Sequence, residues 1–233
     1  MTKKVVKGEY AQKGEYHKHL DKNWKFYSIY VEKMVFIKKY ISRIPKNKKI
    51  IDLGCGEGVL VEEFKKKGYD IVGLDYNYSS KNVIRGDITK MRFKSDSFDL
   101  VMALDVIEHF NFEEQDLAVK EIKRIVKKNG IILISVPNLA HFASRISFLF
   151  LGKLLRTSTI DRHKGDRPIN EYLDLLKEKG LKVLMRKGLF PTYPISSFLT
   201  FFFPSKVVFL HKFLNKFLAY PNWCLLNIIE LKK

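Results

Sequence analysis

The chain has 233 residues, of which 46% are apolar and 29% are charged, a composition that excludes a disordered polymer and suits one folded domain. Lys and Arg total 43 against 25 Asp and Glu, so the formal net charge is +18. This charge favours anionic partners, namely nucleic acid, phosphorylated small molecules or a membrane surface, but does not choose among them.

The predicted elements begin with a helix near the N-terminus. Residues 1–8 are basic and further charges follow them, so we predict no signal peptide. Residues 24–44 place apolar side chains at close to a helical period among lysines, and Pro45 ends the pattern. We therefore predict an amphipathic helix, and we assign residues 1–45 to an N-terminal helical lid.

Short apolar runs alternate with helical or turn segments between residues 46 and 138. The predicted strands are 49–54, 70–75, 83–87, 98–105 and 131–136, and the predicted helices are 59–67 and 113–128. This alternation predicts an α/β fold with a doubly wound, mostly parallel sheet.

The C-terminal part adds two apolar segments to this plan. We predict a helix over 169–180, strands over 181–187 and 223–231, and helical character over 139–156 and 206–219. Residues 188–205 carry no charge but contain three prolines, which does not favour a helix that spans a membrane. The chain is thus predicted to be a single domain, with a core at 46–138 and insertions at 139–168 and 188–222, after the fifth and sixth strands.

Charge is distributed unevenly along the chain. Residues 1–50 and 137–233 each carry a net charge of +10, whereas residues 51–136 carry −2. The basic flanks either meet an anionic surface or substrate, or are a solvated Lys-rich surface.

Gly54, Gly56 and Gly58 follow the first predicted strand and precede a helix. At such a place glycines let the backbone approach a ligand, and helix N–H groups face it. Val59 stands where a dinucleotide fingerprint has Gly or Ala, which disfavours nicotinamide or flavin. Asp75 ends the second strand, where a carboxylate can accept hydrogen bonds from two ribose hydroxyls. The strand, the glycines and the spaced acid together predict a cofactor site.

The segment Ile50-Ile-Asp-Leu-Gly-Cys-Gly-Glu-Gly58 resembles the first motif of class I S-adenosylmethionine-dependent methyltransferases. Residues 97–109 resemble the fourth-strand motif of that family, and residues 126–130 resemble its turn before the fifth strand. The resemblance covers residues 50–138 and implies a Rossmann-like fold with S-adenosyl-L-methionine as the cofactor.

The resemblance also implies roles for individual residues, with Asp75 on the ribose and Asp87 near the adenine. The cofactor-binding residues that it implies are Asp52, Gly54, Gly56, Gly58, Asp75, Tyr76, Asp87, Ile88 and Asp105. A structural interpretation stays open, in which Asp52 caps the loop while Asp75 and Asp87 form Asx turns.

Asp105, Glu108 and His109 are the candidate catalytic residues, because they follow the fourth strand at the edge where open α/β sheets bind ligands. His109 is the candidate base for a hydroxyl nucleophile. In the alternative interpretation, His109 has only a structural role before the next helix. The segment also resembles the metal-binding segment of ubiquinone-type and small-RNA 2′-O-methyltransferases. However, Asp105 replaces their more usual Glu and no remaining ligand is identifiable, so we predict no metal site.

Residues after the fifth strand are expected to form the acceptor pocket. Asn138, His141, Arg145 and residues 161–167 supply donors suited to phosphate or carboxylate, although His141 and His163 also fit a solvated loop. Residues 15–19 either fold over the cofactor or belong to the surface.

Residues 135–180 resemble, more loosely, small-molecule methyltransferases of quinone and cell-surface glycan pathways. This resemblance implies that the methyl group is transferred to a small-molecule acceptor or to one linked to a lipid or glycan. It also implies that the methylated atom is oxygen. Two alternatives stay open. The first is an RNA methyltransferase, which the positive charge favours, although the sequence has no Asn/Asp-Pro-Pro-aromatic segment after the fourth strand. The second is a catalytically silent subunit that binds S-adenosylmethionine and needs no catalytic residue.

The segment 206–219 has three interpretations: a basic helix on a membrane, a core helix of an enlarged domain, or the seam of a homodimer. Two cysteines provide no disulfide framework, which is typical of a reducing compartment. We predict a cytoplasmic protein, at the inner membrane surface if this helix meets lipid.

Overall fold

A seven-stranded sheet forms the centre of the computed structural model, which describes residues 20–233. The strands are β1 (Lys49–Leu53), β2 (Asp70–Asp75), β3 (Val83–Arg85), β4 (Phe98–Leu104), β5 (Val126–Pro137), β6 (Lys182–Pro191) and β7 (Cys224–Lys232). Their order in the sheet is β3-β2-β1-β4-β5-β7-β6, and β7 runs antiparallel to both of its neighbours. The predicted α/β class and mostly parallel sheet are confirmed.

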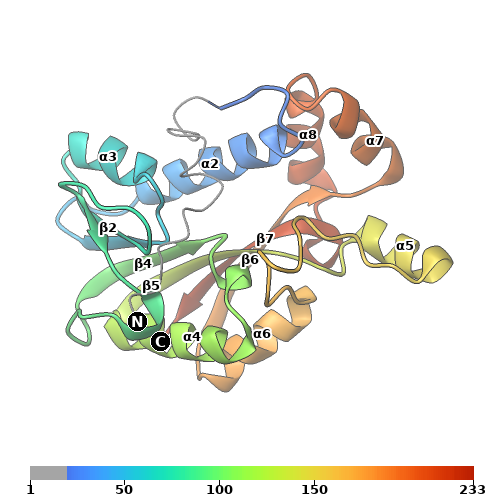
Figure 1. The fold of residues 1–233 in the computed structure, drawn as a ribbon. Coiled ribbons are helices and arrows are strands. Elements are labelled where there is room, and N and C mark those ends of the chain that lie inside the picture. Colours follow the sequence, from blue (N-terminus) through green and yellow to red (C-terminus); the bar gives the residue numbers. More distant parts are fainter. Residues whose placement is uncertain (1–19) are drawn as a thin grey trace.

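Helices cover both faces of this sheet (Figure 1). They are α2 (Tyr27–Ile41), α3 (Val59–Lys66), α4 (Phe112–Ile125), α5 (Phe142–Leu151), α6 (Ile169–Glu178), α7 (Pro194–Phe202) and α8 (Val208–Phe217), with short 3-10 turns at Ile88–Lys90, Ile107–His109 and Pro221–Trp223. Side chains alternate along a strand, so Ile50 faces the core under α2 and α3 whereas Ile51 faces the core under α4 and α6.

Several element boundaries differ from the sequence predictions. The helix predicted to reach residue 128 ends at Ile125, because Val126 already pairs with Phe98 as the start of β5. Helix α7 was not predicted, since the three prolines of residues 188–205 suggested an interruption, but Pro194 stands in its first turn, where a missing N–H costs nothing. No helix within residues 20–233 is long and apolar enough to cross a membrane. The lid segment predicted at residues 15–19 lies outside the described residues.

Buried polar side chains attach α7 and α8 to the sheet. The Thr200 hydroxyl donates to the Ser196 carbonyl and accepts from Nε2–H of His211 at 2.6 Å. The His211 ring stacks on Phe190 at 4.2 Å, and the Phe190 N–H donates to the Asn215 side chain at 2.7 Å. Burial lowers the pKa of His211 to about 4, so its imidazole is neutral at physiological pH.

This buried histidine predicts a loss of stability in mild acid. The unfolded chain binds a proton at His211 near pH 6.5, and the folded protein does so only near pH 4. Its contribution to the free energy of unfolding is therefore complete above pH 6.5 and falls as the pH drops toward 4. When the pH falls from 7.5 to 5.0, we expect His211 alone to lower the free energy of unfolding by about 2 kcal/mol. Urea unfolding of wild type and His211→Gln at both pH values measures this, and equal acid sensitivity of the two proteins would contradict it.

Candidate active site

The loop between β1 and α3 presents three glycines in left-handed conformation, with φ of +67° at Gly54, +53° at Gly56 and +71° at Gly58. A Cβ at Gly54 would lie 2.4 Å from Val106, and one at Gly58 would lie 2.6 Å from Val83, so packing explains these two positions. A Cβ at Gly56 would meet no atom of residues 20–233 within 4 Å. Gly56 therefore borders open space, where the backbone can contact a ligand.

Asp75 holds this loop from the end of β2. Its Oδ2 accepts from the Gly56 N–H at 2.8 Å, and its Oδ1 accepts from the N–H groups of Asn77 at 2.8 Å and Tyr78 at 3.1 Å. The carboxylate thus forms the Asx turn considered in the sequence analysis and also ties the turn to the glycine loop.

The other predicted cofactor residues lie around this loop. Asp52 is buried in β1, and burial together with the nearby Asp75 charge raises its pKa to about 7, although Lys33 opposes the shift. Asp87 caps the turn at Ile88–Lys90 through the Thr89 N–H and hydroxyl, at 2.9 and 2.7 Å. Tyr76 is about half exposed, at 48%, whereas Ile88 is buried.

Asp105 directly follows β4 and has a left-handed conformation, with φ of +55°, which is uncommon for a residue other than glycine. Its carboxylate accepts a hydrogen bond from the Ser135 hydroxyl and forms an ion pair with Lys33 of α2. Burial raises the pKa of this carboxyl, but the Lys33 charge and both hydrogen bonds outweigh burial and keep the pKa below its ordinary value. The ion pair joins α2 to the end of β4.

Lys33 was not among the predicted site residues, although its position carried a signal. Ile29, Lys33, Ile37 and Ile41 follow one another at steps of four and lie on the buried face of α2. Lys33 is only 6% exposed, so a lysine within this apolar stripe indicated a buried carboxylate partner.

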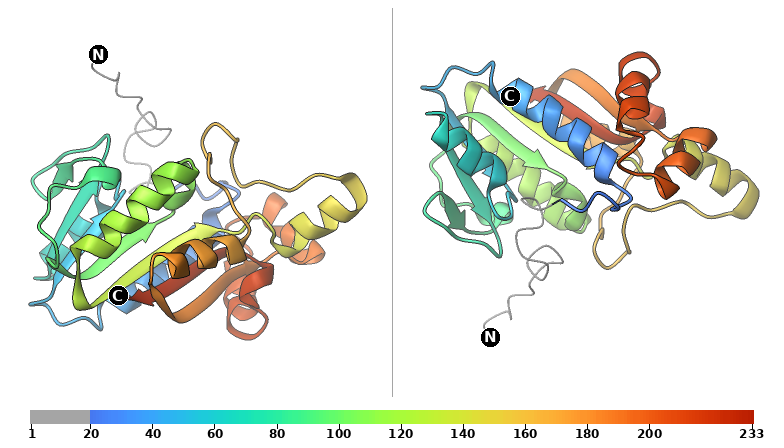
Figure 2. Two further views of the ribbon diagram at one scale, coloured as in Figure 1. Left: turned by 90° about the horizontal axis from the view of Figure 1, so that it is seen from below. Right: turned by 90° about the horizontal axis from the view of Figure 1, so that it is seen from above.

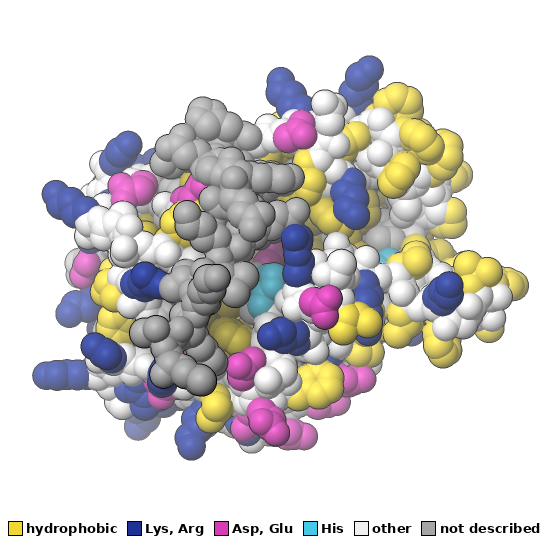
Figure 3. All heavy atoms as spheres, viewed as in Figure 1, with side chains coloured by type: hydrophobic (Ala, Val, Ile, Leu, Met, Phe, Trp, Pro, Cys, Tyr) yellow, Lys and Arg dark blue, Asp and Glu magenta, His cyan; other side chains and the backbone are white. Residues whose placement is uncertain are grey.

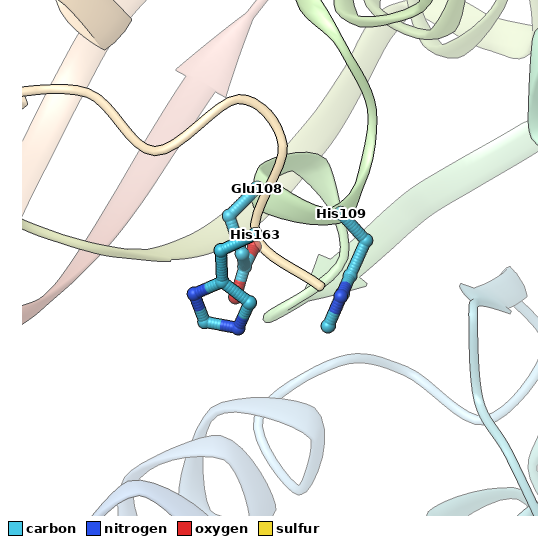
Figure 4. Close-up of side chains that lie close together, drawn as sticks. All are labelled: Glu108, His109 and His163. Carbon is cyan, nitrogen blue, oxygen red and sulfur yellow. The ribbon is translucent and has the colours of Figure 1, made fainter. Parts of the chain in front are cut away.

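Glu108, His109 and His163 come together (Figure 4). One potential ligand atom from each residue lies within 4.8 Å of the others. Glu108 and His109 belong to the turn after β4, whereas His163 comes from the loop between α5 and α6. Sequence analysis considered His163 only as an acceptor-pocket or loop residue.

Both histidines of this cluster are oriented through Nδ1. Nδ1 of His109 lies 3.0 Å from the Arg162 carbonyl, which only accepts, so Nδ1 carries the hydrogen. Nδ1 of His163 lies 3.1 Å from the Asp166 carboxylate, which assigns its hydrogen in the same way. Each Nε2 is then left with a lone pair. Burial and the neighbouring His163 lower the pKa of His109, which keeps its ring neutral.

Glu108 adds a third acceptor to this cluster. Its carboxyl is buried, and its Oε2 has no hydrogen-bond partner among the described residues. Burial and the adjacent Asp105 charge raise the pKa of Glu108 well above its ordinary value. A bound cation would supply the positive charge that this carboxyl lacks.

His141 has a structural position. It caps the start of α5, where its Nδ1 lies 2.9 Å from the Thr192 hydroxyl and 3.3 Å from the Ser144 nitrogen. Burial lowers its pKa to about 4. Asn138 is buried beside it and bonds the backbone of residues 140, 169, 222 and 224.

A family model for the methyltransferase domain matches residues 29–187. This chain belongs to the methyltransferase-domain family. The ubiquinone biosynthesis O-methyltransferase of Pelagibacter ubique (strain HTCC1062) is 28% identical over 160 residues, which cover 62% of this chain and 65% of that protein. The match thus spans less than two thirds of that relative's length.

Two solved structures are similar in fold. A SAM dependent methyltransferase from Archaeoglobus fulgidus has a TM-score of 0.57 at 18% identity, covering 85% of this chain and 92% of its own. The PH0226 protein from Pyrococcus horikoshii OT3 has a TM-score of 0.59 at 16% identity, covering 93% of this chain and 97% of its own.

The sequence predictions of a class I methyltransferase and of S-adenosylmethionine as its cofactor are confirmed by these comparisons. The methyltransferase's own residues fit that cofactor. The open space beside Gly56 lies next to Asp75, so a ligand at the glycine loop would meet a carboxylate suited to ribose hydroxyls.

We expect Asp75→Ala to weaken S-adenosylmethionine binding about 10- to 100-fold, because charge-assisted hydrogen bonds are lost. Asp75→Asn keeps one acceptor for the Asx turn but removes the charge, so it should weaken binding as well. Isothermal titration calorimetry measures both. Asp70→Ala, at the exposed start of the same strand, is the matched control and should bind normally. If both Asp75 variants bind S-adenosylmethionine with wild-type affinity, Asp75 has only a structural role in the turn.

Proposed function

We propose that this methyltransferase transfers the methyl group of S-adenosylmethionine to an oxygen of a small-molecule acceptor, with lipid- or glycan-linked acceptors included in that class. The observation that carries the proposal is the convergence of Glu108, His109 and His163 at the carboxyl end of β4. The name of the Pelagibacter relative supports oxygen as the target and a small molecule as the acceptor.

The cluster fits a divalent cation better than a lone catalytic base. One ring nitrogen from each histidine and one carboxylate oxygen of Glu108 lie within 4.8 Å of one another, and a base would need only one of these groups. Each histidine is also anchored through Nδ1 to a carbonyl or carboxylate, as metal-ligating histidines are. We therefore replace the expectation of no metal with a proposed site in which His163 supplies the ligand that the sequence did not identify.

Each part of the site has its own proposed task. Bound S-adenosylmethionine supplies a methyl group activated by the sulfonium charge. The glycine loop and Asp75 would bind the cofactor, and Lys33 and Ser135 fix the Asp105 carboxylate at the end of β4. Glu108, His109 and His163 would hold a divalent cation, which lowers the pKa of a hydroxyl that contacts it.

The chemical step is an in-line displacement. The acceptor oxygen forms a bond to the methyl carbon while the carbon–sulfur bond breaks. The electron pair of the carbon–sulfur bond stays on sulfur and neutralises the sulfonium charge. The acceptor proton passes to solvent or to a neutral base. If the site works without a cation, Nε2 of His109 is the atom that receives this proton, as the sequence analysis expected.

His163→Ala distinguishes these two forms of the mechanism. A cation site predicts that this change lowers methyl transfer by at least about 10-fold and reduces the manganese or zinc that the purified protein retains, because one ligand is lost. Transfer is measured with labelled S-adenosylmethionine and an extract of the native host, and metal by mass spectrometry. Lys164→Ala, exposed in the same loop, is the matched control.

Other results of this assay would contradict parts of the proposal. If His163→Ala and chelator-treated enzyme keep full methyl transfer while His109→Ala loses it, the site holds no catalytic cation and His109 acts as a base. Label that enters RNA would favour the RNA methyltransferase. An absence of labelled product in every fraction, despite cofactor binding, would favour the silent subunit.

We also propose a reducing, cytoplasmic compartment for the reaction. Cys55 and Cys224 are both free, and burial raises the pKa of each thiol, so neither is primed for oxidation.

A further inference from the structure

Helices α5, α7 and α8 present large apolar side chains to solvent. On α5, Phe148 and Phe150 are exposed, and on α7 so are Ile195 and Phe201. Phe209 of α8 is 81% exposed, more than any other exposed large apolar side chain among the described residues. We call the exposed faces of these helices the three-helix surface. Soluble monomers rarely expose large contiguous apolar patches that have no binding function.

The same helices turn polar side chains inward. The buried residues of α5 and α7 are Ser144, Ser196 and Thr200, and α8 buries His211 and Asn215 alongside Leu214. A surface helix of a water-soluble domain normally has the opposite arrangement, with its apolar stripe toward the core. Because hydrogen bonds attach these helices to the domain, their aromatic side chains are left available for a partner.

The three helices form one end of the molecule. Figures 1 and 2 show α5, α7 and α8 at the same end of the sheet, away from α3. The base of α5 is fixed to the start of α7, since the Phe142 and Tyr193 rings lie 5.5 Å apart and the Ala143 N–H donates to the Thr192 hydroxyl at 3.0 Å. Hydrophobic side chains gather over this end in Figure 3.

The charge of this end has a single sign. No Asp or Glu occurs in residues 139–160 or 188–222, which contain the three helices, whereas six basic residues occur there. These are Arg145, Lys153, Arg156, Lys206, Lys212 and Lys216, and all six are exposed.

We propose that the three-helix surface docks the protein on a bilayer with anionic headgroups. Aromatic and aliphatic side chains would enter the boundary between headgroups and acyl chains, and the five cations other than Arg156 would face the lipid phosphates. A second copy of the chain fits less well, because an isologous dimer would bring two copies of a surface whose helices carry no acidic residue against each other. This inference does not depend on the chemical step or on the acceptor.

Docking would also place the site near the lipid. The chain leaves α5 at its exposed end and returns through residues 152–168, the loop that carries His163. Within this loop Arg156 pairs with Asp166 at 3.3 Å, and Asp166 in turn holds His163 at 3.1 Å. The surface and the catalytic cluster therefore share one segment.

Vesicle sedimentation of the full chain tests the proposal. We expect binding to vesicles of phosphatidylcholine with phosphatidylglycerol, little binding to phosphatidylcholine alone, and weaker binding as salt rises. Phe150→Ser with Phe209→Ser should reduce binding strongly. Lys212→Gln and Lys216→Gln should each reduce the partition coefficient about fivefold. Leu117→Ser, at an exposed position of α4 away from this surface, is the matched control.

The same variants separate the other occupants of the surface. All of them should keep the wild-type melting temperature, since the substituted side chains are exposed. Absence of sedimentation with anionic vesicles at low salt would overturn the proposal. A dimer in light scattering that Phe150→Ser with Phe209→Ser dissociates would assign the surface to a second copy, and a gel shift with RNA that these changes abolish would assign it to nucleic acid.

Discussion

Strands β1 and β4 lie side by side at the centre of the sheet, and the chain leaves them toward opposite edges. Their connections therefore separate at the carboxyl ends of the two strands, which is where open α/β sheets bind ligands. The glycine loop follows β1, and the segment from Asp105 to His109 follows β4, so residues about fifty positions apart lie at the same edge of the sheet. The Lys33–Asp105 ion pair attaches α2 beside it, which adds a third element to the site.

The sheet could be predicted because its strands are short apolar runs bounded by turn residues, a pattern that burial on both faces requires. Ends of elements were less predictable, since tertiary pairing decides them. Val126 shows this: its local sequence continues the helical pattern of α4, but its backbone pairs with Phe98. Pro194 shows the limit of local rules, because proline starts a helix as readily as it interrupts one.

Motif residues of the site were predictable because their chemistry depends on nearby backbone. Asp75 bonds the turn that follows it, and Asp87 caps its own turn. Lys33 and His163 were harder to predict, because their partners are distant in sequence. Asp105 lies 72 positions from Lys33. His109 and Glu108 lie 54 and 55 positions from His163. Only the fold brings such groups together, and a lysine or histidine considered alone fits a solvated surface equally well.

Amphipathic periodicity shows that a helix has two different faces but does not say which face is buried. The segment 206–219 was compatible with a core helix, and the exposure of Phe213 at 50% and Phe217 at 61% excludes that interpretation for these aromatics. On the inward face of α8, Nε2 of His211 instead bonds Thr200 and the Asn215 side chain bonds the Phe190 backbone. A polar face can be buried when directional hydrogen bonds hold it, whereas an apolar face needs only a partner of low polarity. The helices at this end of the methyltransferase therefore use directional hydrogen bonds for attachment and leave their non-directional hydrophobic surface for a partner, which suits a fluid lipid boundary better than a shaped protein groove.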